Sequence, residues 1–243
     1  METIPSHFLS HHVKKICLSV SVRPTHAERI LTTCTGVTDL AFWVDYLGGS
    51  PSLSIVPFIS PLPLRRLSIE LAHFMSLFAQ PGVRHAWLNS LTHLDIIFWT
   101  HVPAPAVSHL DQLPSLTHLA LRLRHNHPEE NSLISILSAC KCLKLLVILD
   151  EMESVEESVW TTDPRVVYIP YPSNIVREWE SQARQDHGCN WSRAEDLVRR
   201  HTAQHESSYI SSHPQPWRVI SKSEISGTAS MQNPLSPRST SVS

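Results

Sequence analysis

The sequence predicts an α/β fold in which short parallel strands and helices alternate along a solenoid. The strands are indicated by a repeated pattern, L-x-x-L-x-L, at residues 91–96 and 116–121. The helices are indicated by residues 27–34 and 133–140, where apolar side chains follow the spacing i, i+3, i+4 and i+7. The middle apolar residue of the strand pattern, here called the anchor, recurs at Ile16, Leu40, Leu67, Leu94, Leu119, Leu146 and Val167.

The spacing of the anchors is that of a known kind of repeat. Successive anchors lie 24, 27, 27, 25, 27 and 21 residues apart. Intervals of about 20–29 residues are typical of leucine-rich repeats, whose strands line the concave side of a horseshoe. We therefore expect an irregular leucine-rich-repeat solenoid of about seven parallel strands with helices on the convex side. Residues 1–172 are assigned to this solenoid.

The segments between the strands differ in their helical character. Thr25 and Glu28 have the spacing of a capping box at the start of the first helix, and Gly36 suits the left-handed residue after its end. Residues 71–78 carry a third apolar stripe and predict another helix. Residues 48–63 are rich in Pro and Ser, so an irregular or single-turn segment is expected there.

Two helices are predicted after the last strand. Ser173 or Asn174 can cap the first of them, and Ser192 with Glu195 three residues later can open the second. Both helices carry Trp on an apolar side. We expect residues 173–205 to form a C-terminal helical cap, because the end of a solenoid otherwise exposes an apolar edge.

The last part of the chain has a different composition. From residue 206 onward, Ser, Thr and Pro dominate and apolar periodicity disappears. Such a segment cannot bury enough apolar surface to fold. Residues 206–243 are therefore predicted to be a disordered Ser/Pro-rich tail.

Composition limits the classes of partner. The chain has 243 residues, of which 17% are charged, and a net charge of −2, so no positive field attracts nucleic acid or acidic lipid. No stretch reaches the roughly 18 uncharged apolar residues of a membrane span. Of the five cysteines, Cys17, Cys34 and Cys140 fall on apolar positions of the repeats, which suits reduced thiols. We expect an intracellular protein, cytoplasmic or nuclear, with no nucleic-acid partner and no membrane association.

Enzyme motifs are missing from the sequence. It contains no G-x-S-x-G, no H-E-x-x-H and no glycine-rich phosphate loop. We therefore expect no enzymatic activity, no catalytic residue and no cofactor.

Several segments together resemble one family. Residues 30–37 and 136–143 align without a gap, and each has a cysteine six residues before its anchor. Residues 91–96, 113–119, 163–166 and 191–195 add to the likeness. In these segments the chain resembles the F-box-associated leucine-rich-repeat-like proteins of mushroom-forming fungi. The resemblance implies a scaffold related to the substrate-binding half of F-box proteins, which bind a protein partner, and a link to a ubiquitin-ligase adaptor.

We do not expect an F-box in this sequence. Only about a dozen residues precede the first predicted strand, whereas the F-box that docks on the adaptor is a longer helical module. The resemblance therefore carries over only the part of the family's role that concerns partner binding.

The strand pattern also maps the expected binding surface. Side chains alternate along a strand, so residues one before, one after and three after each anchor face the concave side. Lys15, Asp39 and Arg66 would lie side by side, either as a solvated ladder of charges or as a recognition stripe anchored by an exposed Trp43. The partner-binding residues predicted on this face are Lys15, Asp39, Trp43, Arg66, Glu70, His93, Asp95, His118 and Arg122.

On the last strands, the same face is predicted to be apolar. The residues concerned are Leu145, Val147, Leu149, Val166 and Tyr168. Either the terminal helices or the tail cover them, or they form a docking groove. We favour a cover, because a bare apolar patch is a liability for a monomer.

One cluster on this face has alternative chemistry. His93 and His118, from neighbouring parallel strands, could hold zinc together with Asp95 and a water. The same two histidines also follow from repetition of the phrase L-T-H-L, which needs no metal. We expect a non-catalytic protein–protein recognition scaffold without a metal, and the alternative is a metal-dependent hydrolase that uses this His/Asp cluster.

Overall fold

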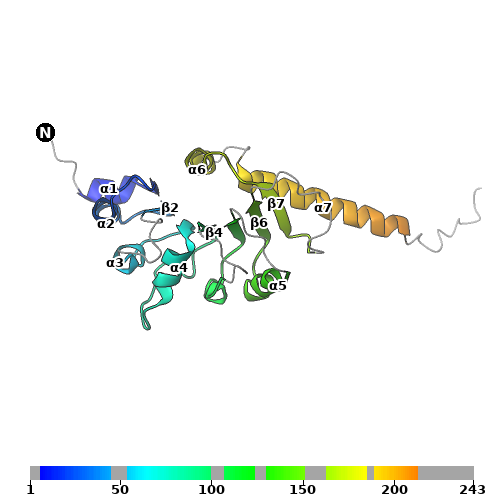
Figure 1. The fold of residues 1–243 in the computed structure, drawn as a ribbon, viewed down its shortest axis with the longest axis horizontal. Helices are drawn as coiled ribbons and strands as arrows, with labels where there is room; N and C mark the ends of the chain where they lie inside the picture. The colour runs from blue at the N-terminus through cyan, green and yellow to red at the C-terminus, as the bar shows by residue number, and fades with distance from the viewer. Residues whose placement is uncertain are drawn as a thin grey trace, which may run out of the picture. The chain divides into compact units, whose positions relative to one another are not determined.

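The structure of the protein, a computed structural model, describes residues 6–44, 54–99, 107–123, 130–150, 163–184 and 189–212. Within these residues, seven parallel strands form a single sheet and pair in the order of the chain (Figure 1). The predicted α/β class and single parallel sheet are confirmed. The strands are β1 (Lys15–Leu18), β2 (Asp39–Phe42), β3 (Arg66–Glu70), β4 (His93–Phe98), β5 (His118–Leu123), β6 (Leu145–Asp150) and β7 (Val166–Pro170).

Helices precede or follow most of these strands. The described helices are α1 (Ser6–His12), α2 (Pro24–Thr33), α3 (Val56–Ile59), α4 (Leu71–Phe78), α5 (Glu130–Ala139), α6 (Ile175–Arg184) and α7 (Asn190–Ser212), with a 3-10 turn η1 (Leu110–Gln112). The three predicted apolar stripes form α2, α4 and α5. The Pro-rich connector contains the single turn α3, and its residues 48–53 lie outside the described part of the chain.

The register follows the anchors through six strands. Ile16, Leu40, Leu67, Leu94, Leu119 and Leu146 are successive Cα partners. The seventh anchor is wrong by one residue, because Leu146 pairs with Val166 and not with Val167. All four residues from Val166 to Ile169 are apolar or aromatic, so alternation does not fix their phase. The backbone N–H of Val166 donates to the carbonyl of Asp163 (3.1 Å), and this turn sets the start of β7.

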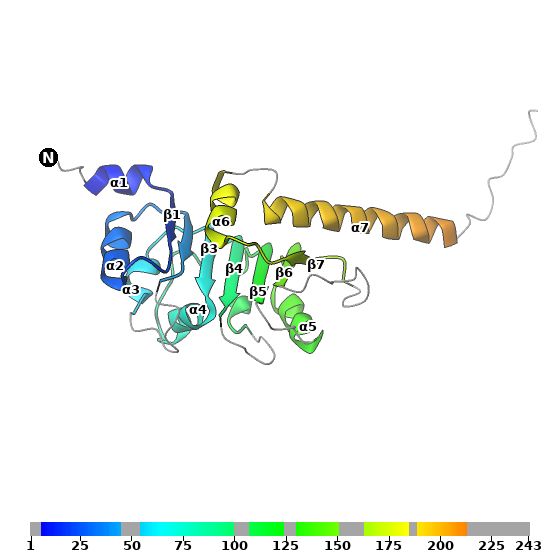
Figure 2. The same ribbon diagram turned by 45° about the horizontal axis from the view of Figure 1, so that its top comes forward.

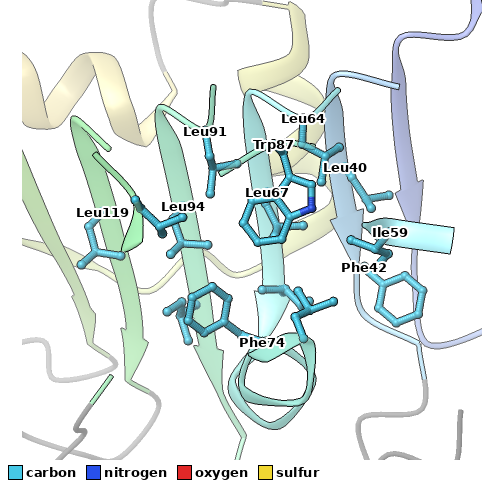
Figure 3. Close-up of a cluster of buried hydrophobic side chains, with 14 of the residues drawn as sticks. Leu40, Phe42, Ile59, Leu64, Leu67, Phe74, Trp87, Leu91, Leu94 and Leu119 are labelled. Atoms are coloured by element: carbon cyan, nitrogen blue, oxygen red, sulfur yellow. The ribbon is translucent and has the colours of Figure 1, made fainter. Parts of the chain in front are cut away.

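The anchors define one side of the sheet, here called the core face. Figure 3 shows Leu40, Leu67, Leu94 and Leu119 projecting from four neighbouring strands into one apolar cluster. The anchors from Leu40 to Leu146 are at most 2% exposed. Full burial of one leucine side chain contributes about 1.5–3 kcal/mol, so repetition of the anchor stabilises every strand in the stack.

Helices α2, α4 and α5 close the core face. Their stripes bury Ala27 and Leu31 from α2, Phe74 and Leu77 from α4, and Leu133 and Ile136 from α5.

The predicted capping box at the start of α2 is wrong. Pro24 occupies the first turn, Arg23 is the N-cap residue, and no side chain caps the helix. The fixed φ of proline suits the first helical position, so the helix begins before Thr25.

Gly36 has another role than the one predicted. Among the described glycines only Gly82 has a positive φ. A Cβ atom on Gly36 would lie 1.8 Å from the carbonyl oxygen of Ser10, at the end of α1. The glycine therefore allows close approach of α1 and does not supply a left-handed turn.

Helices α6 and α7 lie on the other side of the sheet from α4 and α5 (Figure 2). Asn174 caps α6, since its Oδ1 accepts a hydrogen bond from the backbone N–H of Arg177 (3.0 Å). Helix α7 begins at Asn190, so Ser192 lies inside it and is not its cap. Both helices, up to Gln204, belong to the first of two compact units of the chain.

The last described helix extends past the predicted boundary between cap and tail, whereas the second compact unit of the chain begins at His205, next to that boundary. Helix α7 continues to Ser212, beyond the expected end of the cap at residue 205. Adding residues to an existing helix costs far less than nucleating one, so a polar sequence can extend it. Residues 213–243 of the predicted tail lie outside the described part of the chain.

Candidate functional site

The side of the sheet opposite the core face is here called the second face, and it is the face predicted to be concave and open. Its residues lie in rows across the strands, because the strands are in register. The first row, at the strand starts, consists of Lys15, Asp39, Arg66, His93, His118 and Leu145. A row further along contains Glu70, Ile97, Arg122 and Leu149. The predicted neighbour relations within these rows are confirmed.

The predicted ladder of alternating charges is only partly formed. Arg66 Nε lies 3.6 Å from Asp39 Oδ1, with side-chain exposures of 35% and 15%. Thr38 donates a hydrogen bond to the same carboxylate (2.7 Å). The Lys15 ammonium instead donates to the carbonyl of Ala183, in the last turn of α6. Lys15 therefore holds the carboxyl end of a helix that covers the face.

A buried network of polar side chains runs across the middle of the second face. Trp43 Nε1 donates to Ser68 Oγ (3.0 Å), which donates to Asp95 Oδ2 (2.9 Å). Arg122 Nε donates to both oxygens of Asp95, at 2.8 and 2.9 Å. Arg122 Nη2 donates to Glu178 Oε2 on α6 (2.8 Å). The network thus connects second-face residues on or directly after four neighbouring strands, β2 to β5, to the covering helix α6.

This burial corrects the prediction of an open face. Trp43, Asp95 and Arg122 are exposed by only 1%, 4% and 1%, so none of them is accessible while α6 is in place. Burial alone would lower the pKa of Arg122, but the carboxylates of Asp95 and Glu178 raise it above its ordinary value. The guanidinium therefore stays charged and paired.

Residues that the sequence analysis did not select complete the network. Gln182 Nε2 donates to Glu178 Oε1, and Gln182 Oε1 accepts from Trp191 Nε1 (3.0 Å). Asn190 N donates to Glu178 Oε1 (3.4 Å). Glu178 and Gln182 are four residues apart and therefore share one helix face. This spacing, on the same side of the helix as Trp179, could have indicated from the sequence that both residues face the sheet. It does not identify Arg122 as the partner of Glu178.

The two predicted histidines lie together. The rings of His93 and His118 are stacked, with centroids 4.2 Å apart and planes 3° from parallel. The ring of Trp191 meets both edge-on, at 5.4 and 5.7 Å. His118 Nε2 lies 3.1 Å from Glu195 Oε1 on α7. The repeated histidines therefore form a platform for the first turns of α7.

Threonine hydroxyls fix the orientation of these rings. The Thr92 hydroxyl donates to the carbonyl of Arg65 (3.1 Å), so its oxygen accepts from His93 Nδ1–H (2.9 Å). This arrangement leaves His93 Nε2 as an acceptor. Thr117 Oγ1 lies equally close to His118 Nδ1 (2.8 Å), but here the hydroxyl donates to Nδ1, because the Nε2–H of a neutral His118 donates to the Glu195 carboxylate.

Both histidines are neutral at neutral pH. Burial, together with the neighbouring His118 and the Arg66 guanidinium, lowers the pKa of His93 to about 3. Burial also lowers the pKa of His118, although Glu195 acts in the opposite direction. The contact between His118 and Glu195 is therefore a hydrogen bond and not an ion pair near pH 7.

The apolar end of the second face is covered by α7, as we favoured. The cover consists of Cys189, Trp191 and Ala194, with Leu197 and Val198 at its margin. It packs against Ala120, Leu145, Val147, Leu149, Val167 and Ile169. Because β7 is shifted by one residue, Val167 and Ile169 face the cover from β7, and the predicted Val166 and Tyr168 do not.

Glu70 serves a local structural purpose. Its carboxylate accepts a hydrogen bond from the backbone N–H of His73 (3.0 Å) and so caps α4. Burial raises the pKa of Glu70, but hydrogen bonds from His73 and from the helix backbone outweigh it and lower the pKa. The half-buried Glu70 carboxylate is therefore used as the N-cap of α4.

A small hollow remains between the first row and the covering helices. Its walls include Asp39, Arg66, His93, Trp179, Gln182 and Trp191. The free volume is about 20 Å³, which is room for one or two water molecules. The hollow is therefore lined by first-row side chains together with residues of α6 and α7.

The geometry does not assemble the His/Asp cluster proposed for a hydrolase. Asp95 is bound to Arg122 and Ser68, and the parallel rings of His93 and His118 do not aim their nitrogens at one point. Within the described residues, no group of three His, Cys, Asp or Glu side chains is placed to hold a metal ion. The metal-dependent alternative stays a prediction.

None of the helices in the described ranges has both the length and the apolar character to cross a bilayer. No protein-family model, curated protein or solved structure gives a significant match to this chain.

Proposed function

We propose that this chain is a non-catalytic recognition scaffold of the leucine-rich-repeat type. It binds a protein partner through the accessible members of the first row of the second face. The repeat assignment is supported by the regular anchor spacing and by six anchors that are in register. Burial of Trp43, Asp95 and Arg122 moves the contact surface to the first row, where Asp39, Arg66, His93 and His118 are partly buried and Lys15 is exposed.

One observation carries the proposal: each of the strands β1 to β5 adds one polar side chain to the same row on a rigid support. Neighbouring members of the row are spaced by about 4.8 Å, the separation of paired strands. Because the leucine core fixes the backbone beneath them, binding orders little that is not already ordered. Within the row, the side chain of Arg66 is 35% exposed, compared with 15% for its partner Asp39. Arginine is also enriched among the residues that contribute most of the binding energy at interfaces.

The family resemblance extends the proposal to ubiquitin ligases. In that extension, the partner is a substrate and a cullin adaptor joins the complex through a separate contact. Affinity purification of the full chain, followed by mass spectrometry, tests this extension by the presence or absence of the adaptor. Loss of the extension leaves the recognition proposal in place.

The main experiment compares two neighbouring arginines. Arg66→Glu reverses a charge in the first row, whereas Arg65→Glu reverses the same charge on the exposed neighbour outside the row. Tagged full-length chains carrying either substitution are used to recover partners from extracts of cells that express the protein. We expect Arg66→Glu to reduce recovery of the partner at least about tenfold, a loss of about 1.4 kcal/mol.

The control variant decides the outcome. Arg65→Glu is expected to recover the same partners as the original chain, and circular dichroism should show that both variants are folded. Equal recovery by both variants would remove the first row as the binding surface.

A further inference from the structure

We propose that the seat of α6 on the second face is a docking site for an acidic amphipathic helix of a partner protein. Helix α6 is then the internal occupant, which the partner helix displaces. The inference rests on the proposed function and deepens it, because it names the element of the partner that is recognised.

The contacts of α6 are those of a helix bound in a groove. Its carboxylate, Glu178, meets Arg122, and its apolar residues Ile175, Val176 and Trp179 pack against Ala41, Trp43 and Ile97. Lys15 from β1 binds the carbonyl of Ala183 in its last turn. One charged contact, one apolar stripe and one helix-end contact are sufficient to define the position and direction of a helix.

Helix α6 is separable from the rest of the fold. The apolar cluster of the core face contains no residue of α6, so departure of this helix leaves that cluster closed. Arg122 would keep both hydrogen bonds to Asp95 on its own sheet. No buried charge is therefore left without a partner when α6 leaves, and local opening does not require global unfolding.

Without α6, the seat favours an acidic ligand. It presents the cations Lys15, Arg66 and Arg122 against the anions Asp39 and Asp95, an excess of one positive charge. A helix whose buried side carries Glu or Asp complements this charge.

Helix α6 also fits its own seat incompletely. Arg122 Nη1 and Asn190 Nδ2 are buried and have no hydrogen-bond acceptor within the described residues. Both residues contact Glu178, through Arg122 Nη2 and Asn190 N. A partner helix with a second carboxylate beside the first would supply an acceptor that α6 lacks, and so would compete with a tethered helix.

The first measurement is hydrogen exchange on the full-length chain. We expect the amides of α6 to exchange at least about tenfold faster than those of β4 and β5, through an opening that leaves the sheet protected. Equal protection of α6 and the two strands would mean that α6 leaves only on global unfolding, and it would overturn the inference.

The second measurement uses a peptide with the sequence of residues 173–184 of this chain as the probe. Glu178→Ala in the full-length chain removes the internal carboxylate, and Glu180→Ala removes an exposed carboxylate from the same helix as a matched control. We expect the labelled peptide to bind the Glu178→Ala chain at least about tenfold more tightly than the Glu180→Ala chain, because a larger fraction of seats is open. A peptide with Glu178→Gln should bind the open seat more weakly.

Each outcome has a separate meaning. Equal peptide affinity for the two folded variants would refute the docking site. If Glu178→Ala does not fold, the exchange measurement on the unaltered chain still decides. Peptide binding without any effect of Arg66→Glu on partner recovery would keep the α6 seat and remove the first-row proposal, so failures of the two proposals are distinguishable.

Discussion

The two faces of the sheet are built in different ways. On the core face, leucine recurs at one position of the strands β2 to β6, and helices from neighbouring repeats cover it. On the second face, most strands contribute different side chains, and the cover comes from helices much further along the chain. The contact between Arg122 and Glu178 spans 56 residues, and that between His118 and Glu195 spans 77. Repetition therefore specifies the support, and the contacts with the covering helices depend on residues of those helices that do not repeat.

The largest difference between the faces is expected from one strand. Leu94 and Ile97 both lie on β4 and both are fully buried, but Leu94 belongs to the core face and Ile97 to the second face. Leu94→Ala should lower the free energy of unfolding by about 2–5 kcal/mol, because the cavity lies in a continuous core. Urea denaturation measures the change.

Ile97→Ala is the matched substitution on the opposite face. We expect a smaller loss in the free energy of unfolding, because the small cluster beneath α6 can open locally and hydrate. A loss as large as that of Leu94→Ala would mean that the two faces form one cooperative core.

Helix α1 and the residue that follows it add Leu9 and Val13 to the core face. Gly36→Ala would place a Cβ atom 1.8 Å from the carbonyl oxygen of Ser10. The backbone must move, so we expect a loss of about 1–3 kcal/mol, as for other overpacked sites. Thr35→Ala, at the exposed neighbouring residue, should have almost no effect on thermal stability. A neutral Gly36→Ala would show that α1 can shift without cost.

The comparison of the faces also explains how much of the fold could be predicted from the sequence. The anchors predicted the strands and the register, because an apolar anchor at every 24–27 residues is a local, repeated pattern. The prediction failed at β7, where Val166 and Val167 are interchangeable by hydropathy and a turn at Asp163 decided the phase.

The candidate site was less predictable for a physical reason. The rows of the second face followed from alternation along the strands, so Asp39, Arg66, His93 and His118 were placed together correctly. Their accessibility depended on α6 and α7, whose polar contacts have no periodic pattern. A buried arginine needs a carboxylate, but several glutamates in the terminal helices were equally plausible by sequence. Pairing Arg122 with Glu178 required the three-dimensional structure.

The histidines of the first row predict that stability depends on pH. An unfolded histidine titrates near pH 6.5, whereas the pKa of folded His93 is lowered to about 3. Below about pH 6.5, the unfolded state therefore binds more protons, and stability falls as pH decreases toward the folded pKa. The slope from His93 is at most about 1.4 kcal/mol per pH unit. Urea denaturation at pH 7, 6 and 5 measures it.

Two variants assign this slope. His93→Gln should flatten the decrease between pH 7 and 5, whereas His26→Gln, at an exposed position on α2, should leave it unchanged. An unchanged slope in His93→Gln would show that other groups control the acid sensitivity of the fold.

The smallest effect is expected from zinc. His93, Asp95 and His118 lie on neighbouring strands, yet Asp95 is held by Arg122, and the two rings stack in parallel. A metal that binds the folded state raises the melting temperature by mass action. We expect that added zinc does not change the melting temperature and that metal analysis of the purified protein finds no stoichiometric zinc. A rise that disappears in His118→Gln would instead place a metal on the second face and revive the hydrolase alternative. Because zinc would have to break the pair between Asp95 and Arg122, such a rise would also be accompanied by faster hydrogen exchange of α6.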